Sequence, residues 1–371
     1  MSGTASAIAP KVRRRMRLRA LRYAITFTAP LIAAAGFLLG GIWTWVLPVH
    51  AFVVIPLAEL FLSGKHYKLN EQEERAALED PVFDVILYLI VPVQWGMLIW
   101  FLATVGAPGQ AGWEIAGRIA TMGMLCGIYG INVAHELGHR AKRWERDLAR
   151  ALLLTSLYMH FIIEHNRGHH RRVATADDPA SARYGESVYA FWARSIVFSF
   201  LSSWRIEADR LRKAGKAPYG PANEMTQAML WQGALVTTIA LVFGLAAVWA
   251  FLGAALMGIL LLETVNYIEH YGLRRTIGAQ GAPVRVMHYH SWNSDHLPGR
   301  LMLFELTRHS DHHWKASRKY QILQSHADAP QMPTGYPGMM VLSLVPPLFF
   351  HVLHPRLRSL AAEREHLELA R

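Results

Sequence analysis

The stretch AVWAFLGAALMGILLLETVNYIEH, residues 247–270, decides what kind of protein this chain forms. A helix of about 20 predominantly apolar residues crosses the hydrocarbon core of a bilayer. This stretch has that length and carries no charged side chain before Glu263. It ends at His270, so the membrane helix would present an imidazole at one boundary of the bilayer. The stretch therefore predicts an α-helical membrane protein.

Five more stretches have the same apolar character. Together they predict six transmembrane helices, at roughly residues 22–40, 42–62, 82–105, 113–135, 226–245 and 247–270. Short turns without charged side chains join the members of each pair, at Gly40-Gly41, at residues 106–112 and near Gly244. Hydrophobic residues make up 52% of the 371 residues, and soluble chains do not normally carry apolar stretches of this length. With no internal repeat or linker in view, we expect an all-α integral membrane protein with one domain, residues 1–371.

The distribution of positive charge predicts the orientation. Seven lysines and arginines lie in residues 11–22, and the long polar stretches 136–225 and 271–371 fall on the same side of the six predicted helices. Because lysine and arginine are enriched in cytoplasmic segments, we expect both termini and both polar stretches in the cytoplasm. The first apolar stretch is too long for a cleavable secretory signal.

The net charge of +11 does not indicate nucleic-acid binding, because the basic residues flank the predicted spans. They are suited to anionic lipid headgroups and acidic protein partners instead.

Histidines gather in four clusters that hold nine of the chain's 19. The nine are His135 and His139, His165, His169 and His170, His270, and His309, His312 and His313. Residues three or four apart lie on one face of a helix. We therefore expect each spaced pair to offer two ring nitrogens to one point. These pairs are His135/His139, His165/His169, His309/His312 and His309/His313.

The number of histidines indicates two metal ions, because one ion takes about four to six donors and neutral imidazole is a common ligand for Fe, Zn, Cu and Ni. Two predicted helices run toward the cytoplasm and end at His135 and His270, and the other clusters lie in cytoplasmic stretches. All nine are thus expected on one side. A single histidine is more often an ordinary surface or core residue, and we interpret the other ten in that way. Among these ten, His290 and His296 are the first candidates for a role beyond the ordinary one, because they approach the last cluster.

Carboxylates and amides near the nine histidines are candidates to orient the imidazoles and offset the charge of two ions. They are Glu136, Glu164, Glu269 and Asp311, each beside a histidine of the clusters, with Asn132 and Asn266 on the preceding turns. Each has the alternative role of a helix cap or a solvated charge. Glu263 lies two turns before His270 within a span, where a carboxylate is costly and usually faces the bundle interior. We expect it to be hydrogen-bonded there, with direct metal ligation as the alternative.

The chain has one cysteine, Cys126, which we interpret as a small buried hydrophobic residue. An iron–sulfur centre needs about four thiolates, and the sequence has no dinucleotide-binding fingerprint. If the protein carries out redox chemistry, its electrons must come from another protein.

Four segments resemble the membrane-bound alkane 1-monooxygenases, which belong to a histidine-rich class that includes integral-membrane fatty acid desaturases and xylene monooxygenases. The segments are HELGHR at 135–140, FIIEHNRGHHRRVATADDPASARYGESVY at 161–189, NYIEHYGL at 266–273, and HSWNSDHL at 290–297 with LTRHSDHH at 306–313. The resemblance runs from about residue 50 to the segment PQMPTGYPG near residue 337. Departures are Trp314 and Lys315, where small residues are usual, and Glu59, where the family often has Asp.

The resemblance implies two iron ions in a non-haem diiron cap that activates O₂ and hydroxylates the terminal methyl of a linear alkane to a 1-alkanol. It also implies a rubredoxin or ferredoxin with an NAD(P)H-dependent reductase as the electron source, and a location in the bacterial inner membrane. An apolar hydrocarbon would reach the site through membrane lipid. Small Ala51, in the second predicted span, is expected either to leave a substrate pocket open or to be an ordinary lipid-facing or helix-contact residue.

Other functions remain open at the level of sequence. The stretch His135-Glu136-Leu137-Gly138-His139 matches the zinc-protease pattern H-E-x-x-H, but a protease would leave the other clusters unexplained. A hydroxylase of alkyl side chains on arenes or terpenoids, or a desaturase, would share the same histidines. A metal transporter would require polar residues along the spans, which are mostly apolar here.

Overall fold

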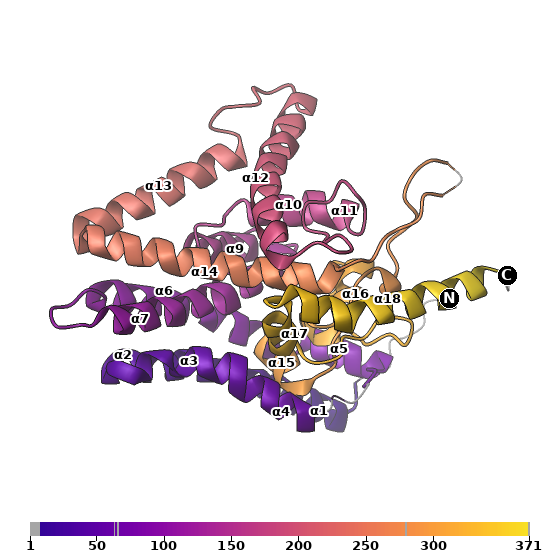
Figure 1. The fold of residues 1–371 in the computed structure, drawn as a ribbon, viewed down its shortest axis with the longest axis horizontal. Coiled ribbons are helices and arrows are strands. Elements are labelled where there is room, and N and C mark those ends of the chain that lie inside the picture. The colour runs from indigo at the N-terminus through magenta and orange to yellow at the C-terminus, as the bar shows by residue number, and fades with distance from the viewer. Residues whose placement is uncertain (1–7, 63, 65–66, 279, 370–371) are drawn as a thin grey trace.

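The computed structural model describes residues 8–62, 64, 67–278 and 280–369. These residues form helices and loops, with two isolated β-bridges and no strand among them. Several long helices lie alongside one another (Figure 1). The short helices α15 (Leu297–Met302), α16 (His309–Trp314) and α17 (Tyr336–Ser343) lie close together, between the middle and the right of that view. The predicted all-α class is confirmed.

The first helical hairpin turns at two glycines. It contains α1 (Pro10–Leu21), a 3₁₀ helix (Arg22–Phe27) and α2 (Thr28–Leu39), then a 3₁₀ helix (Gly41–Trp45), α3 (Val46–Val49), a π-helix (His50–Val54) and α4 (Ile55–Phe61). Gly40 and Gly41 have φ of 63° and 53°, a left-handed conformation that glycine adopts without strain. The predicted turn at these two residues is therefore confirmed.

The second hairpin follows the short helix α5 (Glu71–Glu79). It contains α6 (Val82–Thr104), α7 (Gly112–Leu125), a π-helix (Cys126–Val133) and α8 (Ala134–Gly138). Gly106 and Gly109, with φ of 80° and 86°, make the turn. Cys126 is fully buried, as expected for a core residue.

The third hairpin joins α13 (Glu224–Phe243) to α14 (Leu245–His270) through Gly244, whose φ is 83°. The turns between α2 and α3, α6 and α7, and α13 and α14 all lie at the left of Figure 1, away from α16. The remaining helices are α9 (Arg143–Leu154), α10 (Phe161–Glu164), a π-helix (His165–His169), α11 (His170–Arg172), α12 (Val188–Lys213) and α18 (Pro346–Leu369).

Five helical stretches in the described part of the chain are long and apolar enough to cross a membrane. They are Pro10–Leu39, Gly41–Phe61, Val82–Thr104, Glu224–Phe243 and Leu245–His270. The predicted span 113–135 is helical but is not among them, because polar side chains lower its hydropathy. One of these, Arg118, is buried, lies 3.4 Å from Glu114 and donates a 3.0 Å hydrogen bond to the carbonyl of Phe37.

Small residues let α14 pack tightly against α7 and the π-helix that follows it. A Cβ added at Gly258 would lie 2.7 Å from the Cβ of Cys126, and one added at Gly123 would lie 2.6 Å from the Cβ of Met257. Close approach at small residues is how membrane helices gain packing contacts. Because these two helices run side by side (Figure 1), His135 and His270 arrive at the same end of the bundle.

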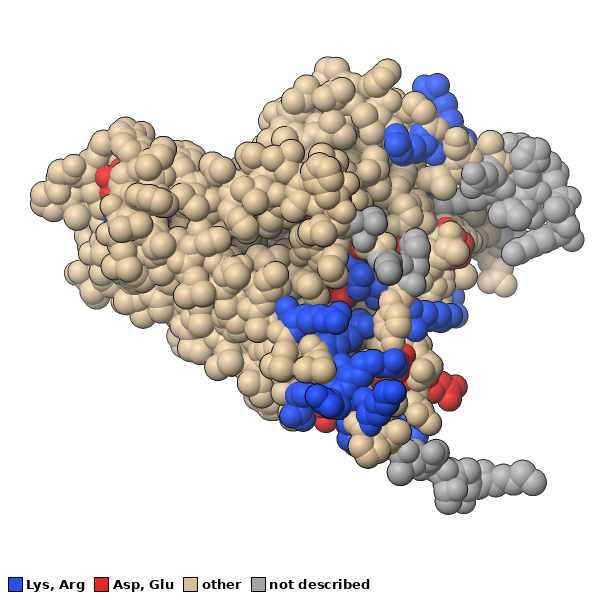
Figure 2. Space-filling view, turned by 90° about the horizontal axis from the view of Figure 1, so that it is seen from below, with Lys and Arg blue, Asp and Glu red and all other residues tan. Residues whose placement is uncertain are grey.

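Charged residues are distributed unevenly over the surface. On the face seen in Figure 2, most of the surface carries no lysine, arginine, aspartate or glutamate, while lysines and arginines gather at one side. Large apolar side chains such as Leu38, Leu241 and Trp249 are more than 70% exposed. A large exposed apolar surface of this kind indicates contact with membrane lipid.

Candidate metal centre

The nine predicted histidines converge in the structure from five helices. His135 lies on α8 and His139 directly follows it; His165 and His169 lie on a π-helix, His170 on α11, His270 at the end of α14, and the last three on α16. They form one group of five, His135, His139, His165, His170 and His312, and one group of four, His169, His270, His309 and His313. In each group, one nitrogen per histidine lies within 4.8 Å of the others.

The grouping corrects two of the predicted pairs. His135/His139 and His309/His313 share a group as expected, but His165 and His169 are in different groups. The reason is the π-helix: its hydrogen bonds run from residue i to i+5, so His170 rather than His169 is aligned with His165. The His309/His312 pair is also divided between the two groups, although the centroids of the two rings lie only 5.8 Å apart.

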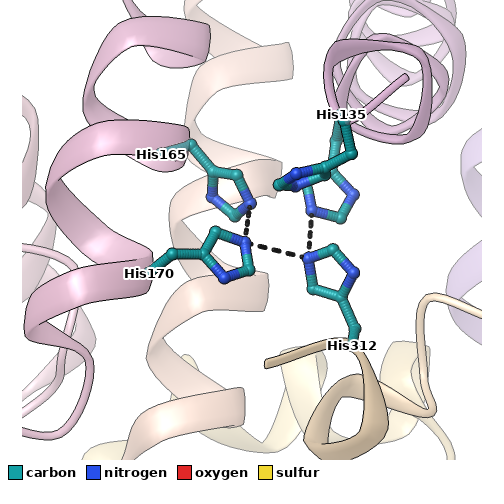
Figure 3. Close-up of side chains that lie close together, drawn as sticks. His135, His165, His170 and His312 are labelled. Carbon is teal, nitrogen blue, oxygen red and sulfur yellow. Dashed lines mark hydrogen bonds between the residues drawn. The ribbon is translucent and has the colours of Figure 1, made fainter. Parts of the chain in front are cut away.

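Distances within the five-histidine group form a connected network (Figure 3). The Nε2 atom of His312 lies 3.0 Å from that of His135 and 3.1 Å from that of His170, which in turn lies 3.0 Å from that of His165. In the four-histidine group the Nε2 atom of His309 lies 2.8 Å from that of His313 and 3.1 Å from that of His270.

Hydrogen bonds alone do not account for this network. A neutral imidazole nitrogen carries either one proton or one lone pair, so the Nε2 of His312 cannot bond to two other Nε2 atoms at once. Two nitrogens bound at right angles to one ion at about 2.1 Å would be about 3 Å apart. The Nε2 of His139 is also buried without a hydrogen-bond partner among the described residues. The arrangement therefore fits two metal ions.

Burial keeps six of the nine imidazoles neutral and their lone pairs available. It lowers the pKa of His139 to about 4. Burial and the neighbouring histidines also hold the pKa well below its ordinary value at five other members of the two groups: His165, His170, His309, His312 and His313. Protonation of these six histidines therefore does not compete with metal binding near neutral pH.

Two carboxylates contact the four-histidine group. The Oδ2 atom of Asp178 lies 2.8 Å from the Nδ1 of His169. Burial would raise the pKa of Asp178, but His169 and nearby hydrogen-bond donors lower it below its ordinary value. Glu269 places Oε2 3.2 Å from the Nε2 of His309 and accepts a 2.7 Å hydrogen bond from the hydroxyl of Tyr336.

Glu269 was predicted beside the metals, whereas Asp178 and Tyr336 were not. The sequence feature that could have indicated Asp178 is the acidic pair Asp177-Asp178, which follows the second histidine cluster. A carboxylate that accepts a hydrogen bond from the far nitrogen of a metal-binding imidazole fixes which nitrogen carries the lone pair.

Two predicted carboxylates point to arginines instead. Glu136 forms an ion pair with Arg140, at 2.8 Å, and accepts a hydrogen bond from the backbone N–H of Tyr320, at 3.3 Å. Asp311 accepts from Arg318 at 2.9 Å, the N–H of Gln324 at 3.0 Å and the Nε2 of His326 at 2.7 Å. These two therefore hold the surrounding chain in place and do not contact the nine histidines.

The other four candidates lie in the interior near the histidines. Glu263 is 2% exposed and accepts a 2.8 Å hydrogen bond from Tyr158, as expected for an interior carboxylate. Asn266 donates to Glu263 at 3.4 Å. These two line a small cavity with Glu164, which pairs with Arg172. Asn132 donates to the carbonyl of Leu303 at 3.3 Å.

An apolar cavity lies within the helical bundle, and residues next to the histidine groups form part of its wall. Its walls come from the π-helix His50–Val54, the π-helix Cys126–Val133, α14 and α17, and they include Ala51, Ile128, Leu261, Val265 and Met340. Its inner end reaches Asn132, on the turn before His135, and Tyr336, which is bonded to Glu269. Ala51 thus lines a cavity, in agreement with the first of its two predicted roles.

A third group, outside the other two, was not predicted. The rings of His288 and His326 stack with centroids 3.5 Å apart, and Oδ2 of Asp328 lies 3.5 Å from Nδ1 of His288. The predicted exceptions His290 and His296 lie in none of the three groups; they bond to the N–H of Met287 and the hydroxyl of Ser294.

The chain is similar to known proteins over most of its length. Residues 111–343 match the family model described as fatty acid desaturase. Alkane 1-monooxygenase 1 of Pseudomonas aeruginosa is 41% identical over 325 residues, covering 87% of this chain and 85% of that protein. Alkane 1-monooxygenase 2 of Alcanivorax borkumensis is 35% identical, covering 85% and 83%. The xylene/toluene monooxygenase hydroxylase component of Pseudomonas putida is 26% identical, covering 91% and 89%.

Proposed function

The chain belongs to the alkane 1-monooxygenase family, within the fatty acid desaturase-like proteins, and we propose that it hydroxylates the terminal methyl of linear alkanes. One alkane, one O₂, two electrons and two protons would give one 1-alkanol and one water. The observation that carries the proposal is the position of the apolar cavity, whose wall includes Asn132, three residues before His135, and Tyr336, which is bonded to Glu269 beside His309.

We assign one iron ion to each histidine group, because imidazole suits iron and the donor sets are of the right size. The group of five would hold one ion, and the group of four would hold the other together with Glu269, whose Oε2 lies beside the Nε2 of His309. When bound, the two irons supply the activation of O₂.

The protein's own residues position these groups. Asp178 would accept a hydrogen bond from the protonated Nδ1 of His169. The lone pair of His169 is then on Nε2, which faces the other histidines of its group. Tyr336 holds Glu269 in place from the opposite side. Tyr158, Glu263 and Asn266 form a hydrogen-bonded set behind His165 and His169 and keep polar groups inside the membrane helix satisfied.

The apolar cavity would bind the alkane and exclude water. Its side chains offer no hydrogen bond that would fix a polar substrate along most of its length, so we infer a saturated hydrocarbon taken directly from the bilayer. Apart from His50, its polar side chains are Asn132 and Tyr336, at the end where the terminal methyl would meet the centre.

We propose the membrane placement and the electron source together. The segment 113–135 would be a sixth span, enclosed by the other five, with the metal centre and both termini on the cytoplasmic side of a bacterial inner membrane. Electrons would come from a rubredoxin or ferredoxin with its NAD(P)H-dependent reductase. Such small donors are acidic in the usual case, and the basic side of the surface in Figure 2 would attract them.

The geometry of Glu136 argues against the zinc-protease alternative. In a protease of the H-E-x-x-H type the glutamate must reach the metal-bound water. Here the Glu136 carboxylate is ion-paired with Arg140 and accepts a hydrogen bond from the N–H of Tyr320.

Reconstitution tests the proposal. The purified chain, loaded with Fe²⁺ under anaerobic conditions and supplied with a rubredoxin system, NADH and O₂, should convert n-alkanes to 1-alkanols and hold two irons per chain. The chain loaded with Zn²⁺ should give no product. Two irons without alkane oxidation, but with oxidation of methyl groups on arenes, would reject the proposed substrate.

A further inference from the structure

A cavity separate from the apolar cavity lies between α9, α10, the end of α12 and the start of α13. Its volume is about 710 Å³, and it has a polar half and an apolar half. The polar half contains Arg143, Arg146, Arg150 and Arg210, and the apolar half includes Ile163 and Trp231. The function proposed above uses none of these side chains.

The polar half carries an excess of positive charge. Four guanidinium groups line the cavity with the carboxylates of Asp147 and Glu224, and Glu207 pairs with Arg210 from outside the lining, which leaves one positive charge. Arg150 is paired with both carboxylates, at 2.6 and 3.2 Å, and Arg210 is paired with Glu207 at 2.8 Å.

The remaining two arginines have capacity for a ligand. Arg146 donates only to the backbone carbonyls of Arg140 and Ala141, at 3.0 and 2.6 Å. Arg143 has no hydrogen bond or ion pair to any residue that the structure describes. Because they lie three residues apart on α9, and Arg150 lies one turn further, all three project from one face of that helix. A row of guanidinium groups binds phosphate oxygens with good geometry.

The apolar half continues from this row into the membrane. Trp231 is seven residues beyond Glu224 on α13, which places it about 10 Å along the helix axis. It is 62% exposed and its neighbour Leu230 is 67% exposed. In α13, only 11% of the apolar stretch that qualifies it as a span is buried within the chain, less than in any other span. Tryptophan at this depth is typical of the membrane interface.

We propose that this cavity binds an anionic phospholipid, with the phosphodiester headgroup on Arg143, Arg146 and Arg150 and an acyl chain along α13 at Trp231. An inorganic phosphate would use the arginines but not the tryptophan, and an acidic protein would not fill an apolar cavity at membrane depth. Only a lipid has both parts at this spacing.

The bound lipid would brace the metal centre. The cavity is also lined by Ile162, on the helix that leads directly into His165. Ile162 packs against Gly138, where an added Cβ would lie 3.0 Å from its Cδ1. Filling the cavity would therefore restrain the two segments that carry His139 and His165.

Binding of phosphatidylglycerol to the detergent-purified full chain tests the proposal, with phosphatidylcholine and inorganic phosphate as separate probes. Phosphatidylglycerol should bind and raise the unfolding midpoint, whereas the other two should not. Each arginine near a charged headgroup contributes about fivefold in affinity. Arg143→Gln should thus weaken binding about fivefold and Arg143→Gln/Arg150→Gln about 25-fold. Trp231→Ala should weaken it as well.

Arg205→Gln on α12 is the matched control, since Arg205 is exposed and does not line the cavity. Its affinity for phosphatidylglycerol should be unchanged. Arg143→Gln keeps the test valid if Arg150→Gln disturbs folding, because Arg143 pairs with no described residue. Equal affinity in Arg143→Gln, Trp231→Ala and the control would overturn the proposal. So would displacement of the lipid by inorganic phosphate, or arginine variants that bind the lipid normally but lose affinity for the electron-donor protein.

Discussion

The hydrogen bond between Asp178 and His169 gives a prediction that separates the two proposed iron sites. Asp178→Asn keeps the size of the side chain but replaces an acceptor oxygen and its charge. Since the Oδ2 atom lies 2.8 Å from the Nδ1 of His169 and the carboxylate is fully enclosed, no water would replace the lost interaction. His169 would then lose the restraint that directs its Nε2 toward the other three histidines.

The expected magnitude follows from the position of Asp178 behind one imidazole of a four-histidine group. Loss of such a partner typically weakens metal binding about 10- to 100-fold, which corresponds to about 1.4–2.7 kcal/mol at tenfold per 1.36 kcal/mol. The effect should be confined to one iron, because Asp178 contacts only His169 among the nine histidines. The five-histidine group should keep its iron at the original affinity.

The assay is a chelator titration of the iron-loaded chain, with iron counted per chain at each chelator concentration. The unaltered protein should lose iron only at high chelator concentrations. The Asp178→Asn variant should lose its first iron at a chelator concentration about 10- to 100-fold lower. Asp177→Asn is the control, because Asp177 is the exposed neighbour. If Asp178→Asn and Asp177→Asn lose iron identically, or if both irons weaken together, the assignment of Asp178 to one site is refuted.

Four further predictions can be tested with the same preparations. Replacement of His270 or His312 by Ala should each remove about one iron per chain and abolish alkane oxidation, whereas His351→Ala on the exposed face of α18 should change neither. Turnover should require a separate donor protein and fall as salt is raised, since exposed charges are screened over about 10 Å at 0.1 M; product from NADH and the chain alone would contradict this. Ala51→Trp should reduce activity on long alkanes and spare the shortest accepted ones, and an unchanged length profile would remove Ala51 from the cavity wall. Burial opposes ionisation of Glu305, but neighbouring arginines lower its pKa from 4.5 to about 2. The ionised carboxylate therefore stabilises the fold above pH 4.5, and this contribution is lost as the pH falls toward 2. In thermal unfolding, Glu305→Gln should lower the stability by about 3–5 kcal/mol, because it leaves buried arginines unpaired.

The helical hairpins and the convergence of the histidines could be predicted because both depend on local sequence. An apolar stretch of sufficient length forms a membrane helix wherever it occurs, and the turns at Gly40-Gly41 and Gly244 follow from the conformational freedom of glycine. Once the hairpins are placed, His135 and His270 must lie at the same end. The segment 113–135 is the weakest of these predictions, because it is enclosed by other helices and so does not need to be apolar throughout.

The partners of individual histidines could not be predicted in this way. The i,i+4 rule describes an α-helix, and it fails at His165 because the chain there is a π-helix. Asp178 and His169 are nine positions apart, and their contact depends on the short helix α11 and the irregular chain that follows it. The pair His288 and His326 is joined only through the folding of two loops that are 38 residues apart in sequence.

The π-helices, which depart from regular α-helix, lie where the chain lines the apolar cavity or carries histidines of the two groups. The described residues contain three, His50–Val54, Cys126–Val133 and His165–His169. The first two line the apolar cavity and the third carries two of the nine histidines. A π-helix is rare, and where it interrupts an α-helix it is frequently at a functional site. Each one widens its helix locally and turns the following side chains by a fraction of a turn. At His165–His169 this rotation gives His169 to one metal site and His170 to the other, so a single short segment can serve two ions. A continuous α-helix would direct His165 and His169 to the same ion and leave the second site one ligand short.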